Sequence, residues 1–433
     1  MYPQIPDFHR LVTQVAEYSS LKHEYGAEGV SDILKEAESA LKIIISKIKE
    51  LPNNTELEKL EPDNLMDIRK LRTDGPRRIW TNFNRNRYME KLEGAIIARF
   101  AGCTLGAAVE FWSIEKMEEW AKHIGDQFPP VDYWSKITNP IDLRYDKSLF
   151  EEYTRDKMDG VPVDDDITYT ILDLLIAEEQ GLNFTTSDVG KAWLKYLPYA
   201  CTAEDVALRN LKAGIPAMQA ADIDNPYCQW IGADIRSDGW AYMAPAYPEK
   251  AAEMAYKDAY LSHRRNGIYG EMFFSAVQSA AFAVDNAIDA IKIGLSEIPK
   301  GCILYKEVIW ALEAGKDIKN YREARQAVDN RFNGMSGVHT NNNACLTIFG
   351  LMMGGNDVTK VISNIVAMGL DNDCTAATAG SIVGAIVGKD GIPAKWYKNF
   401  NNKVRTYLIN QEWFEIDNLI ERYAAQAEKL YSL

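Results

Sequence analysis

Apolar side chains recur every three or four positions along most of the chain, and this spacing is typical of amphipathic helices. Residues 28–50 show it most clearly, with apolar positions at Val30, Ile33, Leu34, Ala37, Leu41, Ile44 and Ile45. The same period continues in residues 167–179, 249–262, 271–292, 304–314 and 413–430. Alternation of period two between tight turns, which would indicate strands, is scarce. The pattern therefore predicts a fold that is mostly or wholly α-helical.

The first 88 residues differ from the remainder of the chain. They are predicted to hold two or three helices and then a loop-rich stretch that is locally basic, with Arg69, Lys70, Arg72, Arg77, Arg78, Arg85 and Arg87. Charge runs usually face water, so the simpler interpretation is a solvated connector that wraps the main body. The alternative is a lid that attracts phosphate toward an acidic site. Residues 89–433 are predicted to form one continuous helical domain.

Composition narrows the class of protein. The 433 residues are 47% hydrophobic and 25% charged, which are ordinary values for a folded globular protein. With 62 acidic against 48 basic residues the net charge is −14, so we expect no general nucleic-acid binding, whereas metal cations are suitable ligands. The longest small-and-apolar stretch, residues 376–387, is too short to span a membrane. Six scattered cysteines without a CxxC pair favour a reducing compartment, and we expect a cytoplasmic protein.

Three consecutive carboxylates, Asp164, Asp165 and Asp166, precede a predicted helix. Aspartate favours helix starts because its oxygen caps free amide groups and its charge complements the helix dipole. One or two aspartates suffice for that role, and a third adds repulsion unless a cation offsets it. A hard divalent cation with oxygen ligands would remove this repulsion. N-capping and metal binding are therefore both open for this segment.

A second acidic pair, Asp371 and Asp373, also opens a predicted helix, after a glycine at position 369 that permits a tight turn. A turn with two solvated acids is the simpler interpretation. The helix that follows, however, carries glycine at every fourth position, at Gly380, Gly384 and Gly388. Glycine costs about 1 kcal/mol relative to alanine in a helix, so three on one face predict that another backbone packs very close. Such packing would hold both acids on a rigid element.

A third acidic position, Glu110, ends a stretch of small residues, 94–110, that is predicted to be helical. A lone glutamate there is usually a surface residue, so Glu110 becomes a candidate site residue only because of the other two acidic clusters. His263 and His339 lie beside glycines and amides, among them Asn341, which suit a polar ligand. A structural histidine is the simpler interpretation for each. The sequence has no HExxH, P-loop, GxGxxG or GxSxG motif.

These three clusters, in this order, resemble the ADP-ribosylglycohydrolase superfamily, which includes the dinitrogenase-reductase-activating glycohydrolases. The family's Gly-Asp-x-x-Gly-x-x-x-Glu resembles residues 102–110, its Thr-Asp-Asp-Thr resembles residues 164–167, and its Gly-x-Asp-Thr-Asp-Thr resembles residues 369–374. Residues 261–270 are similar to the family's Ser-His stretch and the glycine-bearing loop after it. The resemblance covers roughly residues 90–400 and leaves the first 88 outside.

The resemblance implies an all-α orthogonal helix bundle around a central binuclear metal site. It implies two Mg²⁺ ions, with Mn²⁺ as the alternative, and hydrolysis at the anomeric carbon of an ADP-ribosyl group carried by a protein or by a small acceptor. The expected metal ligands are Glu110, Asp164, Asp165, Asp166, Asp371 and Asp373, and the expected catalytic carboxylates are Glu110 and Asp165. The candidate substrate-binding residues are Gly232, Arg236, His263, Gly267, Tyr269, Gly270, His339 and Asn341.

The chain also departs from the family pattern. Cys103 stands where the family has aspartate, and Asp164 and Cys374 stand where family members supply hydroxyl ligands. A charged group thus replaces a neutral ligand at 164, and a soft thiol, which is a poor Mg²⁺ ligand, replaces one at 374. In the family's substrate loop, residues 231–236 here, only Gly232 and Arg236 match well.

Three other functions are weighed against ADP-ribosyl hydrolysis. The altered substrate loop would suit a simpler ribosyl compound, such as a nucleoside or a ribosyl phosphate. A non-enzymatic binding or structural protein on the same fold is disfavoured, because a buried anionic cluster without a metal is costly to retain. An all-α prenyl-transfer enzyme would need a DDxxD helix, and here residues 165–169 end in Tyr169 instead.

Overall fold

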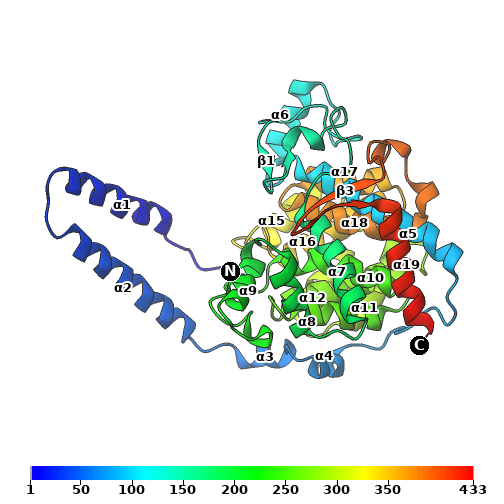
Figure 1. The fold of residues 1–433 in the computed structure, drawn as a ribbon, viewed down its shortest axis with the longest axis horizontal. Helices are drawn as coiled ribbons and strands as arrows, with labels where there is room; N and C mark the ends of the chain where they lie inside the picture. The colour runs from blue at the N-terminus through cyan, green and yellow to red at the C-terminus, as the bar shows by residue number, and fades with distance from the viewer. Residues whose placement is uncertain (1, 433) are drawn as a thin grey trace. The chain divides into compact units, whose positions relative to one another are not determined.

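A computed structural model describes residues 2–432 of the chain, which divide into two compact units, Met1–Lys59 and Leu60–Leu433. The first unit holds α1 (Phe8–Glu24), α2 (Val30–Lys49) and most of α3 (Thr55–Leu60), shown in blue in Figure 1. The helix predicted within residues 28–50 is confirmed, and it corresponds to α2. Neither α1 nor α2 buries a residue, although both carry large apolar side chains. The division falls after residue 59, ahead of the boundary expected at residue 88.

The second unit is built almost wholly of helices, so the all-α prediction is confirmed. Its α-helices in the first half are α4 (Leu65–Leu71), α5 (Arg85–Ala107), α6 (Ile114–Ile124), α7 (Asp165–Gln180), α8 (Thr186–Tyr196), α9 (Thr202–Lys212), α10 (Ser237–Met243) and α11 (Pro248–Ala259). Those in the second half are α12 (Asn266–Ala281), α13 (Ala287–Gly294), α14 (Ile303–Ala314), α15 (Tyr321–Arg331), α16 (Thr340–Gly354), α17 (Val358–Met368), α18 (Asn372–Val387) and α19 (Ile416–Ser432). Helices α12 and α18 lie in the interior (Figure 1) and are buried along nearly their whole length.

Two antiparallel hairpins interrupt the helices. Strand β1 (Leu143–Arg144) pairs with β2 (Ser148–Leu149), with Leu143 opposite Leu149 and Arg144 opposite Ser148. Strand β3 (Lys403–Leu408) pairs with β4 (Gln411–Glu415), with an irregularity between Arg405 and Leu408. The period-two rule missed both hairpins, since β1 and β2 are too short to show alternation and β3 is buried on consecutive positions.

Two predicted helices have different bounds in the structure. The segment 271–292 is not continuous but divides into α12 and α13, because Asn286 begins a new helix by accepting a hydrogen bond from the amide of Asp289 at 2.9 Å. The segment 413–430 becomes helical only at Ile416, because Trp413 pairs with Arg405 in the β3–β4 hairpin. Hydrophobic spacing alone does not show a helix cap or the end of a strand, so both helices were predicted with the wrong bounds.

The glycine stripe of α18 packs directly against the backbone of α5. A methyl group added at Gly380 would overlap the carbonyl of Ala98, and one added at Gly384 would overlap the carbonyl of Gly94. On the other helix, Gly102 lies equally close to Ala376, while Gly106 lies against the backbone of Asp373. The predicted close approach of a second backbone is therefore confirmed, and it brings the start of α18 to the end of α5.

Within the second unit, residues 60–88 pack on the remainder through their arginines. Arg72 and Arg77 both pair with the buried Glu297, at 2.6 and 2.8 Å, and Arg85 pairs with Glu428 at 2.6 Å. These ion pairs use the basic groups of the stretch locally, which favours the packed connector over the phosphate-attracting lid. None of the helices in residues 2–432 is both long and apolar enough to cross a membrane.

We expect Gly102→Ala to lower the free energy of unfolding by about 1–3 kcal/mol or more, because the added methyl group meets a backbone that cannot move aside. Its gain in helix propensity, about 1 kcal/mol, is too small to offset that overlap. Urea denaturation measures the change. Gly337→Ala is the control, since its methyl group would meet only the end of the Leu370 side chain, at 3.2 Å. Equal stability of Gly102→Ala and wild type would contradict the close packing.

Candidate active site

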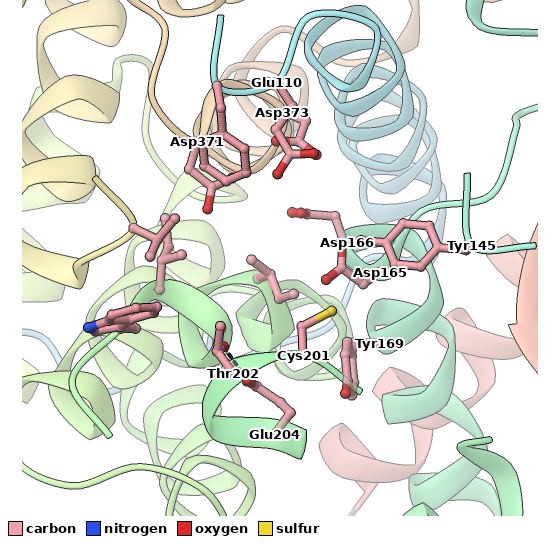
Figure 2. A pocket seen from close by; sticks show the side chains of 16 residues that line it. Glu110, Tyr145, Asp165, Asp166, Tyr169, Cys201, Thr202, Glu204, Asp371 and Asp373 are labelled. Atoms are coloured by element: carbon pink, nitrogen blue, oxygen red, sulfur yellow. Dashed lines mark hydrogen bonds between the residues drawn. The ribbon is translucent and has the colours of Figure 1, made fainter. Parts of the chain in front are cut away.

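Carboxylates from three distant segments meet around one cavity. Glu110 lies just after α5, Asp165 and Asp166 open α7, and Asp371 and Asp373 open α18. Figure 2 shows Glu110 and Asp373 side by side, facing Asp165 and Asp166. These five side chains line a cavity of about 200 Å³. Together with the adjacent Asp164 we call them the acidic cluster: Glu110, Asp164, Asp165, Asp166, Asp371 and Asp373.

The three aspartates at the start of α7 are placed in two ways. Asp164 is the N-cap, and its Oδ1 accepts a hydrogen bond from the amide of Asp166 at 3.0 Å. Asp166 is buried, and the fully buried Arg99 donates to its Oδ1 at 3.2 Å. Arg99 also pairs with Asp238 at 2.7 Å. Capping thus uses one aspartate, while the other two present carboxylates to the cavity.

The start of α18 is held by its turn and by α5. Gly369 and Leu370 both adopt positive φ, at 71° and 61°, and the carbonyl of Leu370 accepts a hydrogen bond from the amide of Phe111 at 3.1 Å. This bond ties the α18 turn to the residue after Glu110. Asp373 is 2% exposed, and its Oδ1 has no hydrogen-bond partner among the described residues. Since buried polar atoms are nearly always paired, this oxygen is available for a ligand.

An arginine that sequence reasoning missed lies inside the acidic cluster. Arg144, at the end of β1, is 10% exposed and donates from Nη1 to Glu110 at 2.6 Å. Its Nη2 pairs with Asp164 and with Asp373, each at 2.8 Å. One guanidinium therefore contacts a carboxylate from each of the three acidic segments.

Burial and mutual repulsion shift the carboxylate pKa values upward. Burial raises the pKa of Asp164 to about 7 despite its pairing with Arg144, and the neighbouring Asp165 adds to the rise. Burial, reinforced by adjacent carboxylates, also raises the pKa values of Asp166, Asp371 and Asp373 well above the ordinary range. The charged forms of these groups therefore require cations in the cavity.

The donor set suits a hard divalent cation. Ligand atoms of Glu110, Asp371 and Asp373 lie within 4.8 Å of one another, and the same holds for residues 164–166. Carboxylate oxygens are the ligands that Mg²⁺ and Mn²⁺ prefer. The two nearby thiols, Cys103 and Cys374, do not add to this set, because burial raises their pKa values and keeps them protonated.

Comparison with known proteins matches this arrangement to one family. The sequence profile described as ADP-ribosylglycohydrolase matches residues 84–431. The chain belongs to the ADP-ribosylglycohydrolase family. It is accordingly a glycosidic-bond hydrolase, of a family that depends on metal ions.

The solved structures support the fold of this family member. A chain titled "ADP-ribosylglycohydrolase-related protein complex" is 16% identical, with a TM-score of 0.50, and the match covers 79% of this chain and 99% of that one. At that identity the likeness concerns the fold. A search of curated protein sequences gives no significant match.

In this glycohydrolase family member, most of the candidate substrate-binding residues are not on the cavity surface. Of the eight substrate-binding candidates, only Gly232 lines the cavity. Arg236 is fully buried behind the wall and pairs with Glu204 and Asp258. His263 is buried as well, and its Nδ1 bonds to the hydroxyl of Ser262 at 2.8 Å. Both positions therefore order the wall rather than face a ligand.

The other candidates are also placed in the scaffold. An added methyl group at Gly267 or Gly270 would overlap Cys228 or Asp234, so both glycines serve close packing. The Tyr269 hydroxyl donates to the carbonyl of Pro62 at 2.6 Å. His339 is the N-cap of α16, where its Nδ1 accepts from the amide of Asn341 at 3.1 Å.

Several cavity residues were not predicted. Three of them, Cys201, Thr202 and Glu204, lie at the start of α9. The others are aromatic or aliphatic: Phe111, Tyr145, Tyr169, Trp230, Ile231, Ile235 and Val338. Tyr169 could have been found, since it follows Asp165 by four positions and so shares its helix face. Val338 is adjacent to His339, which sequence reasoning did select.

Burial lowers the pKa of His339 to about 4, so the ring is neutral when it caps α16. In the unfolded chain the pKa of His339 is near 6.5, so between pH 6.5 and 4 the unfolded state binds more protons than the folded state. The contribution of the neutral ring to the free energy of unfolding is therefore present above pH 6.5 and is lost on acidification, by at most about 3 kcal/mol. We expect His339→Asn, which keeps a capping oxygen, to flatten this part of the stability profile in denaturation at successive pH values. His9→Asn, on an exposed position, is the control, and an unchanged profile for His339→Asn would contradict the assignment.

Proposed function

We propose that this family member is a metal-dependent hydrolase that cleaves the glycosidic bond at the anomeric carbon of an ADP-ribosyl group. The observation that carries the proposal is the convergence of five carboxylates, from Glu110 to Asp373, on one cavity. An anionic cavity of this kind favours a reaction in which positive charge develops on the sugar, and glycosidic cleavage passes through an oxocarbenium-like state.

Asp165 and Glu110 are the carboxylates best placed to move a proton. Asp165 is half-buried, lines the cavity and has no hydrogen-bond partner among the described residues, so its oxygens are free to accept a proton from water. Glu110 has one oxygen engaged by Arg144 and a side chain that is 21% exposed. Either group would act as the base on the attacking water, and the remaining carboxylates would stabilise the cationic sugar.

The metal would be held by the oxygens that face the cavity, from Asp166, Asp371 and Asp373. A bound divalent cation supplies charge stabilisation to substrate oxygens and lowers the pKa of a coordinated water. Asp166 is oriented for this role by Arg99, and Asp373 by the close packing of α18 on α5. Mg²⁺ is proposed first, with Mn²⁺ as the alternative, because both accept carboxylate ligands.

The opposite side of the cavity offers surfaces for the rest of the substrate. Trp230 and Tyr169 present aromatic surface that suits a sugar or a base. The first turn of α9 borders the cavity at Thr202, and its N-cap, Cys201, makes no side-chain cap bond. Free backbone amides at a helix start suit an anionic group such as a phosphate.

A simpler ribosyl compound is the second candidate substrate. The cavity volume, about 200 Å³, lies below the roughly 300–1,000 Å³ of typical ligand sites. Its lining within the described chain includes no lysine or arginine, since Arg236 is turned into the wall. A nucleoside or ribosyl phosphate would make smaller demands on volume and on cationic contacts than ADP-ribose does.

We expect Asp371→Asn to lower turnover by about 100-fold or more while the protein stays folded, because one charged ligand is lost from the cavity. Mass spectrometry of products from ADP-ribosylated proteins, ADP-ribose derivatives and nucleosides, with Mg²⁺ and with chelator, measures the loss and identifies the substrate. Asp390→Asn, on an exposed position, is the matched control. Metal-dependent release of ADP-ribose supports the first candidate, and release from nucleosides alone supports the second. Full turnover by Asp371→Asn would contradict the roles assigned to the cluster.

A separate thermal test concerns the metal. Because a ligand that binds only the folded state stabilises it, Mg²⁺ or Mn²⁺ at about 100 times its dissociation constant should stabilise the protein by about 2.7 kcal/mol. That corresponds to a rise in Tm of about 2–4 °C in a protein of this size. Asp371→Asn should reduce the rise and Asp390→Asn should not. An equal rise in wild type and Asp371→Asn would place the bound ion elsewhere.

A further inference from the structure

We propose that the guanidinium of Arg144 permanently occupies one cation position of the acidic cluster, so that the protein binds a single divalent ion where the family resemblance led us to expect two. The inference rests on the proposed function in one respect, namely that the cluster is a metal centre. It concerns the number of ions and not the substrate.

The contacts of Arg144 are those of a bridging cation. It contacts Glu110 at 2.6 Å and both Asp164 and Asp373 at 2.8 Å. These three acids lie on three separate segments, as the ligands of a shared ion would. A guanidinium cannot lose its charge in a protein, so it satisfies this part of the cluster at all accessible pH values.

The hairpin that carries Arg144 is held by hydrogen bonds from three other segments, one of which leads directly into the acidic cluster. Ser148, opposite Arg144, accepts a hydrogen bond on its Oγ from the amide of Val163 at 3.2 Å, one residue before Asp164. Arg405 donates to the carbonyl of Lys147 at 2.6 Å, and the hydroxyl of Tyr199 donates to the carbonyl of Tyr145 at 2.8 Å. One bond thus ties the hairpin to the residue before Asp164, and two more hold it on the surrounding segments, which opposes withdrawal of the arginine when a metal arrives.

The turn of this hairpin has a strained conformation that holds Arg144 in place. Tyr145 and Asp146 both have positive φ, 52° and 55°, in a turn closed by the amide of Lys147 and the carbonyl of Arg144 at 3.1 Å. Glycine or asparagine normally fills such positions, and the backbone strain is tolerated only where surrounding contacts hold the conformation. Here the ring of Tyr145 packs against that of Tyr407, with centroids 5.2 Å apart, and the guanidinium lies over the Tyr145 ring.

The oxygens that remain define the second position. Both oxygens of Asp164 are engaged, one by the helix cap and one by Arg144, so Asp164 is not available as a ligand. The Oδ1 of Asp373 is buried and has no hydrogen-bond partner among the described residues, and Asp373 lines the cavity together with Asp165, Asp166 and Asp371. These four carboxylates, of which Asp166 is paired with Arg99 and Asp373 with Arg144, suit one divalent ion.

The test is metal stoichiometry of the full-length chain, with Mn²⁺ as the probe. After equilibrium dialysis, elemental analysis gives ions per chain, and electron paramagnetic resonance distinguishes an isolated Mn²⁺ from a spin-coupled pair. We expect wild type to bind one isolated Mn²⁺ and Arg144→Gln to bind two that are coupled. Arg144→Lys keeps a positive charge and should bind one. Lys147→Gln, on the same turn but paired with Glu412 outside the cluster, is the matched control and should also bind one.

A double variant guards against misfolding of Arg144→Gln. Arg144→Gln/Asp164→Asn removes one charge of each sign and so preserves the net charge of the cluster, and it too should bind two ions. The proposal would be overturned by two coupled ions in wild type, by no bound ion in wild type, or by a single ion in both Arg144→Gln and Arg144→Gln/Asp164→Asn. Since none of these measurements uses a substrate, failure of the proposed hydrolysis and failure of this inference are distinguishable.

Discussion

The concentration of six carboxylates in and beside one small cavity is the constraint on which the rest of the structure depends. Like charges at this spacing cannot all ionise without compensation, and burial raises the pKa values of Asp166, Asp371 and Asp373. Each element around the cavity either holds an acid in place or supplies positive potential. The start of α7 supplies amide groups, Arg99 supplies charge to Asp166, and Arg144 supplies charge to Glu110, Asp164 and Asp373.

Rigid positioning of those acids depends on a contact that involves almost no side chains. Because α5 and α18 meet at glycines, their backbones approach closely enough for Gly106 to touch the backbone of Asp373. The same approach places Glu110, at the end of α5, beside the start of α18. A bulkier helix contact would move the two acids apart and would separate the groups that Arg144 bridges. The glycines therefore determine the site as much as the acids do.

The sequence predicts those features of the fold and the site that depend on residues close together in the chain. The three acidic segments and the glycine stripe are local patterns, so the sequence was enough to predict them and the α-helical class. Arg144 left no local mark, because its partners are 20, 34 and 229 positions away and its hairpin is only two pairs long. Arg236 was selected because it matches the family's substrate loop, yet Glu204, Asp258 and Glu271 surround it, and only the tertiary fold brings these acids together.

The position of Asp164 joins these arguments. An acid at this helix start does what any N-cap does, and the local sequence explains it fully by that role. Its second oxygen, however, faces Arg144 in the interior, where an unpaired carboxylate would be costly. The charges of Asp164 and Arg144 thus compensate each other, and the buried position of each is explained by its contact with the other. A third aspartate at the start of α7, which by itself would only increase repulsion, becomes the partner of a cation that the protein itself supplies. The charge balance of the acidic cluster therefore depends on a pair of residues, of which Asp164 belongs to a sequence motif and Arg144 is brought to the cluster only by the fold.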